Sequence, residues 1–214
     1  MFAGRAEAGA KLAEMLADFA GGEGIVLAIP AGGVAVGAAL AKKLGLAFDV
    51  AVVSKILLPW TTEAGFGAAA FDGTVRLNKH LLTGVSLTKE QIEKQTKAAV
   101  QKVQRRVKQL RPDRPMPRLS GRCVILVDDG IASGFTMRVA AEAVGNCGAR
   151  EIIVAVPTAH EQALRDLEKR VSAVYCANVR SGYMFAVAEA YRNWYDVGEK
   201  EAAKLLGEFE NDSV

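Results

Sequence analysis

The chain has 214 residues, of which 50% are hydrophobic and 24% charged, with a formal net charge of +3. This length fits one domain or one domain with a small appendage, and the weak positive charge does not by itself indicate a nucleic-acid-binding protein. Three dispersed cysteines and two histidines lack zinc-type spacing. No apolar run reaches the roughly 18 residues of a membrane span, and the N-terminus is not typical of a signal peptide. We therefore expect a cytoplasmic protein with reduced thiols and no membrane contact.

The first half of the chain predicts helices and strands in alternation. In chain order these are a helix over 5–20, a buried strand over 24–29, a glycine turn that opens a helix over 31–46, and a β-branched strand over 48–54. The next segment, 57–86, is rich in glycine, has scattered aromatic residues and shows no sustained period. It predicts a long loop with a hairpin around "FDGT", and loops of this length are usually functional.

The second half begins with the clearest helix, over 87–110, which Ser86 or Thr88 can cap. Its basic outer face fits a solvated helix surface better than a nucleic-acid patch. After a proline-rich connector, the pattern predicts strands over 123–127, 151–156 and 172–179, helices near 134–147 and 160–170, and an amphipathic helix near the C-terminus.

Strands that alternate with helices imply an α/β fold, with a doubly wound, mostly parallel sheet flanked by helices. We expect residues 1–179 to form the core, including the loop 57–86, and residues 180–214 to form a small C-terminal segment. In such sheets, ligands bind beyond the carboxyl ends of the strands. The glycine-rich segments 31–33 and 130–134 both follow predicted strands, so they are candidate binding loops.

The strand at 123–127 ends in two adjacent aspartates and a loop of small residues, "DDGIASGFT" (128–136). Adjacent side chains diverge where a strand leaves a sheet, so both carboxylates can reach one ligand. They can accept hydrogen bonds from vicinal hydroxyls or hold water around Mg²⁺. The small residues leave backbone N–H groups uncovered at the start of the next helix, where phosphate binds. The stretch therefore predicts a sugar-phosphate site.

Other interpretations of this stretch have weaker support. No Gly-Lys-Ser/Thr follows, as a Walker A loop requires, and the glycines do not form GxGxxG. An aspartate that accepts a phosphoryl group, as in receiver or haloacid-dehalogenase-like proteins, stays open as an alternative, although such acids usually follow the first strand. A plain turn with a capping aspartate would need one acid and no glycine-rich loop.

The segment "VILVDDGIASGFT" resembles the phosphoribosyl-pyrophosphate (PRPP) motif of the type I phosphoribosyltransferases. "LAIPAGGVAVGAALAKKLG" is similar to the pyrophosphate loop of that family and its helix, and "VSKI" places a lysine after a strand, as the family often does. "VPTAHE" and "AVAEAYRNWYDV" resemble a bacterial and archaeal subgroup of inferred phosphoribosyltransferases whose substrate is unsettled. The resemblance covers most of the chain, with the segments in the right order.

This resemblance implies a role for each matching position. The ribose 2- and 3-hydroxyls of PRPP would be held by Asp128 and Asp129, which are also candidates for holding Mg²⁺ that arrives with PRPP and water. The 5-phosphate would bind the backbone and hydroxyls of Ala132, Ser133, Gly134, Phe135 and Thr136. Pyrophosphate would bind Ala31, Gly32, Gly33 and Lys55.

The resemblance also implies a lid and a hood. The loop 57–86 would be a mobile lid that keeps water from an oxocarbenium-like transition state, with Glu63 and Arg76 as the residues to test. Residues 180–214 would form a hood that selects the base. Of its aromatic residues Tyr183, Phe185, Tyr191, Trp194 and Tyr195, we expect Tyr183 and Phe185 to stack on the base.

Two positions depart from the pattern of the family. Many relatives in the subgroup carry arginine where this chain has Ala31, so a bidentate phosphate donor is missing from the pyrophosphate loop. Enzymes of the family that act on 6-oxopurines have an aspartate in the phosphate loop, where this chain has Ala132. Ala132 instead resembles the adenine and uracil types and disfavours hypoxanthine or guanine as the acceptor.

We therefore expect a Mg²⁺-dependent phosphoribosyltransferase of nucleotide salvage that forms a homo-oligomer, a dimer by family resemblance. It would transfer phosphoribose from PRPP to a nitrogen nucleophile, a base or amine, and release pyrophosphate, mostly by electrostatic catalysis. The alternative from another class is a PRPP-sensing regulator that binds nucleic acid, supported only by the basic helix 87–110. Phosphatase-like chemistry at Asp128 is a weaker third alternative.

Overall fold

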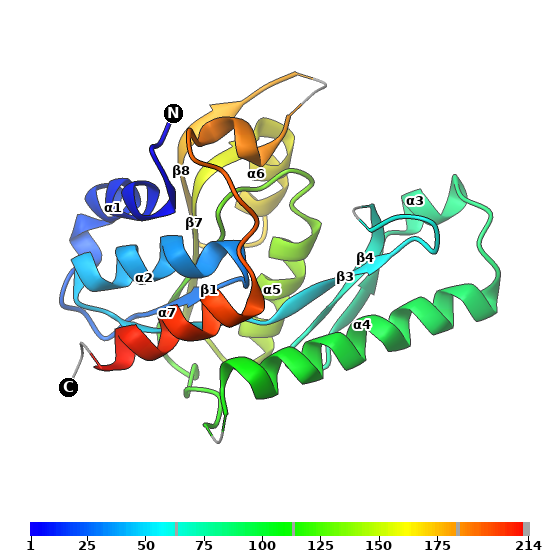
Figure 1. The fold of residues 1–214 in the computed structure, drawn as a ribbon, viewed down its shortest axis with the longest axis horizontal. Helices are drawn as coiled ribbons and strands as arrows, with labels where there is room; N and C mark the ends of the chain where they lie inside the picture. Colours follow the sequence, from blue (N-terminus) through cyan, green and yellow to red (C-terminus); the bar gives the residue numbers. More distant parts are fainter. Residues whose placement is uncertain (63, 113, 183–184, 212–214) are drawn as a thin grey trace.

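Five parallel strands form the central sheet, in the order β2–β1–β6–β7–β8 (Figure 1). The structure is a computed structural model, and it describes residues 1–62, 64–112, 114–182 and 185–211. The strands of the sheet are β1 (Ile25–Ala28), β2 (Ala47–Val50), β6 (Cys123–Val127), β7 (Glu151–His160) and β8 (Ala173–Arg180). The predicted α/β fold is confirmed. Within the described ranges, no helix combines the length and apolar composition needed to cross a membrane.

Helices cover both faces of the central sheet because its strands are apolar on both sides. Val26 and Ile125 face α1 and α2, whereas Ile25 and Leu126 face α5 and α6. Figure 1 shows these two layers around the sheet. The four helices are α1 (Arg5–Met15), α2 (Gly32–Leu44), α5 (Phe135–Asn146) and α6 (Glu161–Glu168). A short 3₁₀ helix, η1 (Ala17–Phe19), follows α1.

A second, antiparallel sheet extends from the side of the core, and it corrects two expectations. The loop predicted over 57–86 is mostly regular: the hairpin around "FDGT" is confirmed, but its first strand also pairs with a further strand, and a short helix follows. The single strand predicted over 48–54 is two strands in different sheets, because the buried run from Val50 to Val53 carries no polar residue to mark the crossing. The elements are β3 (Val53–Leu57), β4 (Gly65–Ala70), β5 (Val75–Leu77) and α3 (Lys79–Thr83).

The long helix α4 (Lys89–Leu110) lies along the antiparallel sheet, and the C-terminal helix α7 (Glu199–Asn211) packs against both α4 and α2 (Figure 1). Of the two predicted cap candidates, Ser86 and Thr88, Thr88 caps α4: its hydroxyl accepts from the Gln91 N–H, and the Gln91 side chain accepts from the Thr88 N–H. Between β8 and α7 lies one 3₁₀ helix, η2 (Val187–Ala190). Residues of the predicted C-terminal segment therefore reach both the sheet and α4.

One buried ion pair joins the end of α4 to the edge strand β2. The Arg111 Nε lies 2.8 Å from the Asp49 Oδ1, and the two side chains are 2% and 10% exposed. Arg111 also donates to the Val50 carbonyl oxygen. Asp49 in turn accepts from the Val50 N–H at 2.6 Å. The polar atoms of this ion pair therefore have hydrogen-bond partners, although both side chains are almost fully excluded from solvent.

We expect Arg111→Ala to lower the free energy of unfolding by about 3–5 kcal/mol, because removal of one partner leaves a buried charge unpaired. Urea denaturation of the purified variant measures this. The matched control is Arg165→Ala, which breaks an exposed pair with Glu161 and should change stability by less than about 0.5 kcal/mol. Equal, small losses in the two variants would contradict the assigned role of Arg111.

Candidate functional site

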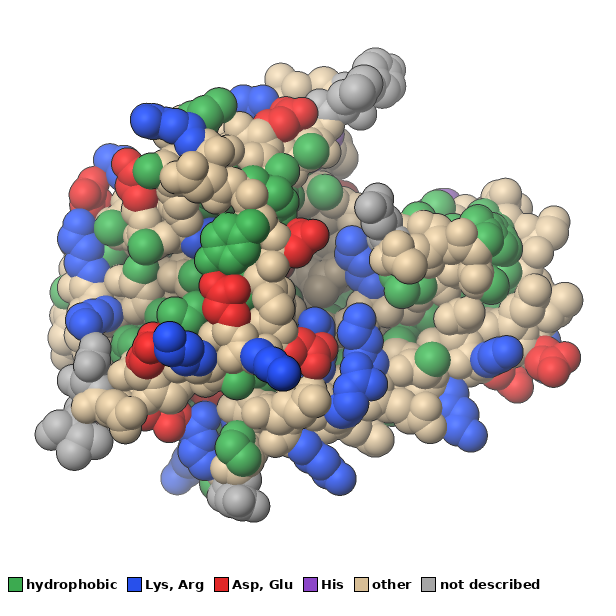
Figure 2. All heavy atoms as spheres, in the orientation of Figure 1, with side chains coloured by type: hydrophobic (Ala, Val, Ile, Leu, Met, Phe, Trp, Pro, Cys, Tyr) green, Lys and Arg blue, Asp and Glu red, His purple; other side chains and the backbone are tan. Residues whose placement is uncertain are grey.

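A cavity of about 480 Å³ opens at the carboxyl ends of β1 and β6. It is lined by the loops that follow these strands, by β3, by α4 and by the segment before α7. Figure 2 shows the hollow between the central body and the antiparallel extension, with Lys and Arg side chains gathered along its α4 edge. The two glycine-rich loops, both predicted to follow strands of one sheet, meet in this site.

The predicted acid pair lines this cavity. The Asp128 Oδ1 accepts a hydrogen bond from the Asp129 N–H at 2.8 Å, which holds the two residues in a fixed relation. Burial, and then the neighbouring Asp129 carboxylate, raise the pKa of Asp128 well above its usual value, while Lys55 acts in the opposite direction. A bound cation or hydroxyl donor would therefore stabilise the charged form of Asp128.

Asp129 is paired with Arg5, which sequence reasoning did not single out. Its Oδ2 accepts from the Arg5 Nε at 3.0 Å and from Nη2 at 2.8 Å, and the Arg5 side chain is 5% exposed. The third arginine contact, from Nη1, goes to the Tyr195 carbonyl oxygen at 2.9 Å. Arg5 and Asp129 are 124 positions apart, so no local pattern could have linked them.

Aromatic residues of the C-terminal segment surround this ion pair. The Arg5 guanidinium carbon lies 4.2 Å from the centre of the Trp194 ring, and the Tyr191 hydroxyl donates to the Asp129 carbonyl oxygen at 2.6 Å. Trp194 and Val187 line the cavity. Phe185 does not line it and lies near the His160 ring instead, and Tyr183 lies outside the described residues. Stacking of Tyr183 or Phe185 on a base therefore stays a prediction, and Trp194 is an aromatic ring of this segment in the cavity wall.

The predicted phosphate loop forms the start of α5, and all five of its predicted residues line the cavity. Gly134 is the N-cap, with φ of 71°, a left-handed conformation that favours glycine. A Cβ there would also lie 3.1 Å from the Ala163 Cβ, which is a second reason for glycine at this position. The loop is held to β7 by two backbone bonds of Ile131, to Thr158 and His160, each 2.9 Å long. These bonds explain why β7 continues four residues beyond its predicted end at 156.

The glycine turn before α2 lies against the acid pair. A Cβ on Gly32 would be 2.0 Å from the Asp129 Oδ2, and a Cβ on Gly33 would be 2.9 Å from the Asp128 Cα. Only glycine permits this approach. Ala31 and Gly32 line the cavity, whereas Gly33 is buried beneath it. The peptide bond between Pro30 and Ala31 is cis.

Three basic side chains line the cavity around β3 and α4. Lys55 was predicted here, but Lys102 and Arg106 were assigned to a solvated helix face, and that assignment is wrong for these two. Burial, and then the neighbouring Arg106, lower the pKa of Lys102. Arg106 is held by the Glu199 Oε1 at 2.6 Å. Their spacing of four, beside the apolar stripe of Ala99 and Val103, was the available signal.

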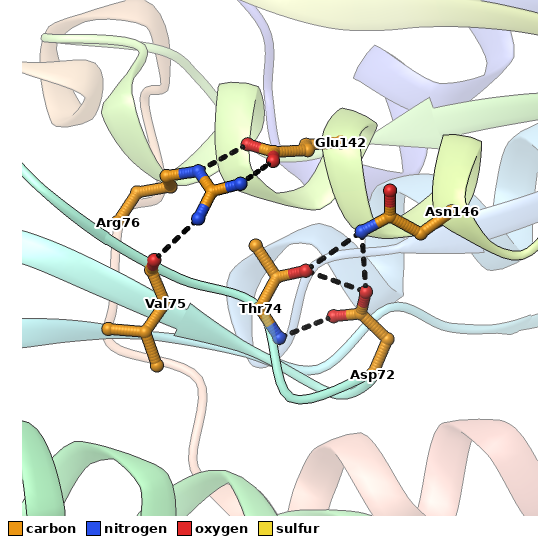
Figure 3. Close-up of polar contacts among 6 residues, drawn as sticks. All are labelled: Asp72, Thr74, Val75, Arg76, Glu142 and Asn146. Carbon is orange, nitrogen blue, oxygen red and sulfur yellow. Dashed lines mark hydrogen bonds and ion pairs between the residues drawn. The ribbon is translucent and has the colours of Figure 1, made fainter.

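Of the two predicted lid residues, Arg76 does not line the cavity. Glu63 lies outside the described residues, and Arg76 on β5 forms two bonds to the Glu142 carboxylate on α5 (Figure 3). Beside this pair, the Asn146 amide donates to Asp72 and Thr74 at 3.0 Å (Figure 3). These contacts fasten the β4–β5 hairpin to α5. From the predicted lid, Leu57 and Thr62 line the cavity.

The acid pair is also the candidate metal site. Among the described residues, no group of three or more His, Cys, Asp or Glu side chains could hold a metal ion by itself. Mg²⁺ commonly binds through one or two carboxylates together with water and substrate phosphates. The two carboxylates beside a phosphate loop fit an ion of that kind, one that arrives with a phosphorylated ligand.

Comparisons with known proteins agree with this geometry. A family model described as "Phosphoribosyl transferase domain" matches residues 72–191. Over 99% of its length, the chain is 32% identical to two proteins of Mycobacterium tuberculosis, MT0597 of strain CDC 1551 / Oshkosh and Rv0571c of strain H37Rv. Both relatives carry the name phosphoribosyl transferase by inference. The chain spans about half (48%) of the length of these curated relatives.

One solved structure is similar over almost its whole length. TT1426 from Thermus thermophilus is 32% identical to this chain, and the match covers 97% of this chain and 98% of that one. The TM-score is 0.78. The two chains therefore share one fold over nearly their whole lengths.

Proposed function

This chain belongs to the phosphoribosyltransferase family, and from that premise we propose that it transfers phosphoribose from PRPP to a nitrogen nucleophile and releases pyrophosphate. The observation that carries the proposal is that the acid pair, the phosphate loop, the glycine turn and three basic side chains line one cavity. PRPP contains a vicinal diol, a monophosphate and a pyrophosphate, and each has a complementary group in this cavity.

PRPP would bind across the cavity, from α5 to α4. Its 5-phosphate lies on the first-turn N–H groups of α5, which have no partner within the helix. Its diol faces Asp128 and Asp129. Its pyrophosphate lies between the turn at 31–33 and the basic side chains of Lys55, Lys102 and Arg106. The last two compensate for the arginine that this chain lacks at Ala31.

The protein stabilises the departing pyrophosphate by fixed charge rather than by a covalent step. As the bond to the anomeric carbon breaks, negative charge grows on the pyrophosphate, and the ammonium and guanidinium groups along α4 favour that charge. Asp128 and Asp129 would hold Mg²⁺, which neutralises pyrophosphate charge when it is bound. Leu57 and Thr62, which line the cavity, would limit the access of water.

The acceptor is expected to be a nucleobase that lies against the hood. Trp194 offers an aromatic surface in the cavity wall, and Val187 an apolar one. The Val187 side chain lies where a Cβ on Gly130 would be, 2.4 Å away, so the hood closes directly over the acid loop. Ala132 in the phosphate loop disfavours a 6-oxopurine, which leaves adenine-like bases and pyrimidines as the first to test.

The direct test is release of pyrophosphate from PRPP and Mg²⁺ in the presence of a panel of purine and pyrimidine bases. Turnover with one base supports the proposal and identifies the acceptor. Tight PRPP binding with no turnover on any base would contradict the proposed transferase activity. The alternative function, a PRPP-sensing regulator, would then be favoured. The basic helix no longer favours that regulator, because two of its cations belong to the cavity.

We expect Lys102→Ala to raise the KM for PRPP and the Kd for Mg²⁺-pyrophosphate by about tenfold or more, because a hydrogen bond to a charged group contributes roughly 1.5–3 kcal/mol. Steady-state kinetics and isothermal titration calorimetry measure the two constants. Lys108→Ala is the matched control, since Lys108 is exposed on the same helix and does not line the cavity. Equal behaviour of the two variants would remove Lys102 from the pyrophosphate site.

A further inference from the structure

Resting on the proposed function, we propose that Arg5 is a positioning residue for Asp129: it occupies one oxygen of that carboxylate and leaves the other to a ribose hydroxyl of the substrate. The inference starts from an asymmetry in the ion pair. An arginine facing a carboxylate usually bonds both oxygens. Here both Nε and Nη2 of Arg5 donate to the single oxygen Oδ2.

The opposite side of the same oxygen is closed by the glycine turn. A Cβ on Gly32 would lie 2.0 Å from Oδ2 but 3.1 Å from Oδ1, so Oδ2 is the oxygen that contacts the turn. Oδ2 is therefore enclosed by Arg5 and Gly32. Asp129 lines the cavity, and both of its bonds from Arg5 go to Oδ2, so the proposal assigns Oδ1 to the ligand. The carboxylate thus has a structural oxygen and a ligand oxygen.

Arg5 is itself held from several directions, which a positioning group requires. Its Nη1 donates to the Tyr195 carbonyl, and its guanidinium stacks over the Trp194 ring. The N-terminal segment that carries it pairs with the C-terminal segment through backbone bonds from Phe2 to Ala190 at 2.7 Å and from Arg192 to Phe2 at 2.8 Å. The Tyr191 hydroxyl completes the frame by holding the Asp129 backbone.

The Arg5 guanidinium also offsets the repulsion between the Asp128 and Asp129 carboxylates. Two neighbouring carboxylates repel each other, and each would turn away from the other if it were free to do so. A positive charge on the outer side of Asp129 offsets that repulsion and fixes the direction in which the carboxylate points. The hood and the N-terminal helix thereby act on the diol site through one side chain, although neither contributes a ligand to the diol.

The test compares sugars that differ by one hydroxyl. Binding of ribose 5-phosphate, 2-deoxyribose 5-phosphate and 3-deoxyribose 5-phosphate is measured by calorimetry for the wild type, Arg5→Ala and Arg5→Lys, with Mg²⁺-pyrophosphate as a fourth ligand. We expect the wild type to bind ribose 5-phosphate about tenfold or more tightly than at least one deoxy sugar, because a hydrogen bond to a charged group is lost.

In Arg5→Ala we expect the larger of these ratios to fall below about threefold, while the affinity for Mg²⁺-pyrophosphate stays within about twofold of the wild type. Arg5→Lys keeps the charge but not the planar fork. Its ratio of ribose 5-phosphate affinity to deoxy-sugar affinity should be at most about a third of the wild-type ratio. Arg180→Ala is the matched control: it breaks an exposed pair with Glu189 in the hood segment and should keep the wild-type ratio.

Retention of the wild-type ratio in Arg5→Ala overturns the positioning role and leaves the proposed function intact. If Arg5→Ala does not fold by circular dichroism, Arg5→Lys decides, and a wild-type ratio there overturns the role as well. A parallel loss of sugar and pyrophosphate affinity would also overturn it, because that result indicates a general structural part. Failure of the wild type to bind PRPP or to discriminate between the sugars counts against the proposed function itself.

Discussion

Asp128→Asn is expected to weaken PRPP binding by about 100-fold or more and, at the same time, to raise the melting temperature of the ligand-free protein at pH 8. The loss of affinity follows because the amide no longer offers a charge to the ribose hydroxyls and Mg²⁺. The gain in stability follows because burial and the Asp129 carboxylate disfavour the ionised form of Asp128. The variant keeps an oxygen for the Asp129 N–H.

The sign of the pH effect is set by the raised pKa of Asp128 in the folded state. The stability that this group contributes is fully present below its ordinary pKa of about 3.9 and is lost as the pH rises through the raised folded value. The variant has no such loss. Calorimetry with chelator present measures the difference in melting temperature between the variant and the wild type. This difference should be large at about pH 8 and should become small near pH 4.

Asp128→Asn combined with Asp129→Asn should abolish PRPP binding altogether, since both diol acceptors are neutral. Unchanged PRPP affinity in this double variant would remove the ribose assignment. A melting-temperature difference that widens towards low pH would instead contradict the burial of a charged Asp128. The two outcomes are independent, so the ligand role and the electrostatic state of this residue are tested separately.

Gly32→Ala is expected to lower both activity and stability, by about 100-fold or more in kcat/KM and by about 1–3 kcal/mol in the free energy of unfolding. The added methyl group would lie 2.0 Å from the Asp129 Oδ2 and 2.6 Å from its Cγ, so the carboxylate must move. Its movement displaces the Arg5 fork and the ligand oxygen together. Kinetics with PRPP and urea denaturation measure the two effects.

The control is Gly207→Ala in α7, where a Cβ would meet nothing within 4 Å. Alanine is favoured over glycine inside a helix by roughly 0.5–1 kcal/mol, so this variant should be slightly more stable and fully active. If Gly32→Ala behaves like Gly207→Ala, the close approach of the turn to Asp129 does not control the site.

The elements of the core and the principal motif could be predicted from the sequence. The strand β6 was predicted with its observed bounds of 123–127, because a fully apolar run ends abruptly in two aspartates. The capping of α4 by Thr88 and the meeting of two glycine-rich loops at one sheet edge followed from local rules on capping and on parallel sheets. Each of these depends on residues close in the chain or on a topological rule that all such sheets obey.

What the sequence did not reveal depends on contacts between distant segments. Arg5 has no signal of its own, because its partner Asp129 and its aromatic neighbours lie more than 100 residues away. Lys102 and Arg106 are ordinary basic residues of an amphipathic helix until α4 packs beside β3 and turns them into the cavity. From the sequence, Arg76 is a reasonable lid residue. In the structure it bonds Glu142 and so holds the β4–β5 hairpin against α5.

The sequence by itself thus determined the type of fold and the motif of two aspartates before a glycine-rich loop, because hydrophobic period, capping and loop composition act over a few residues. The tertiary structure alone decided which cations and which aromatic residues line the cavity, and which oxygen of Asp129 bonds to Arg5. These depend on side chains that three separate elements bring within hydrogen-bond distance, and such meetings are fixed by packing of the whole chain.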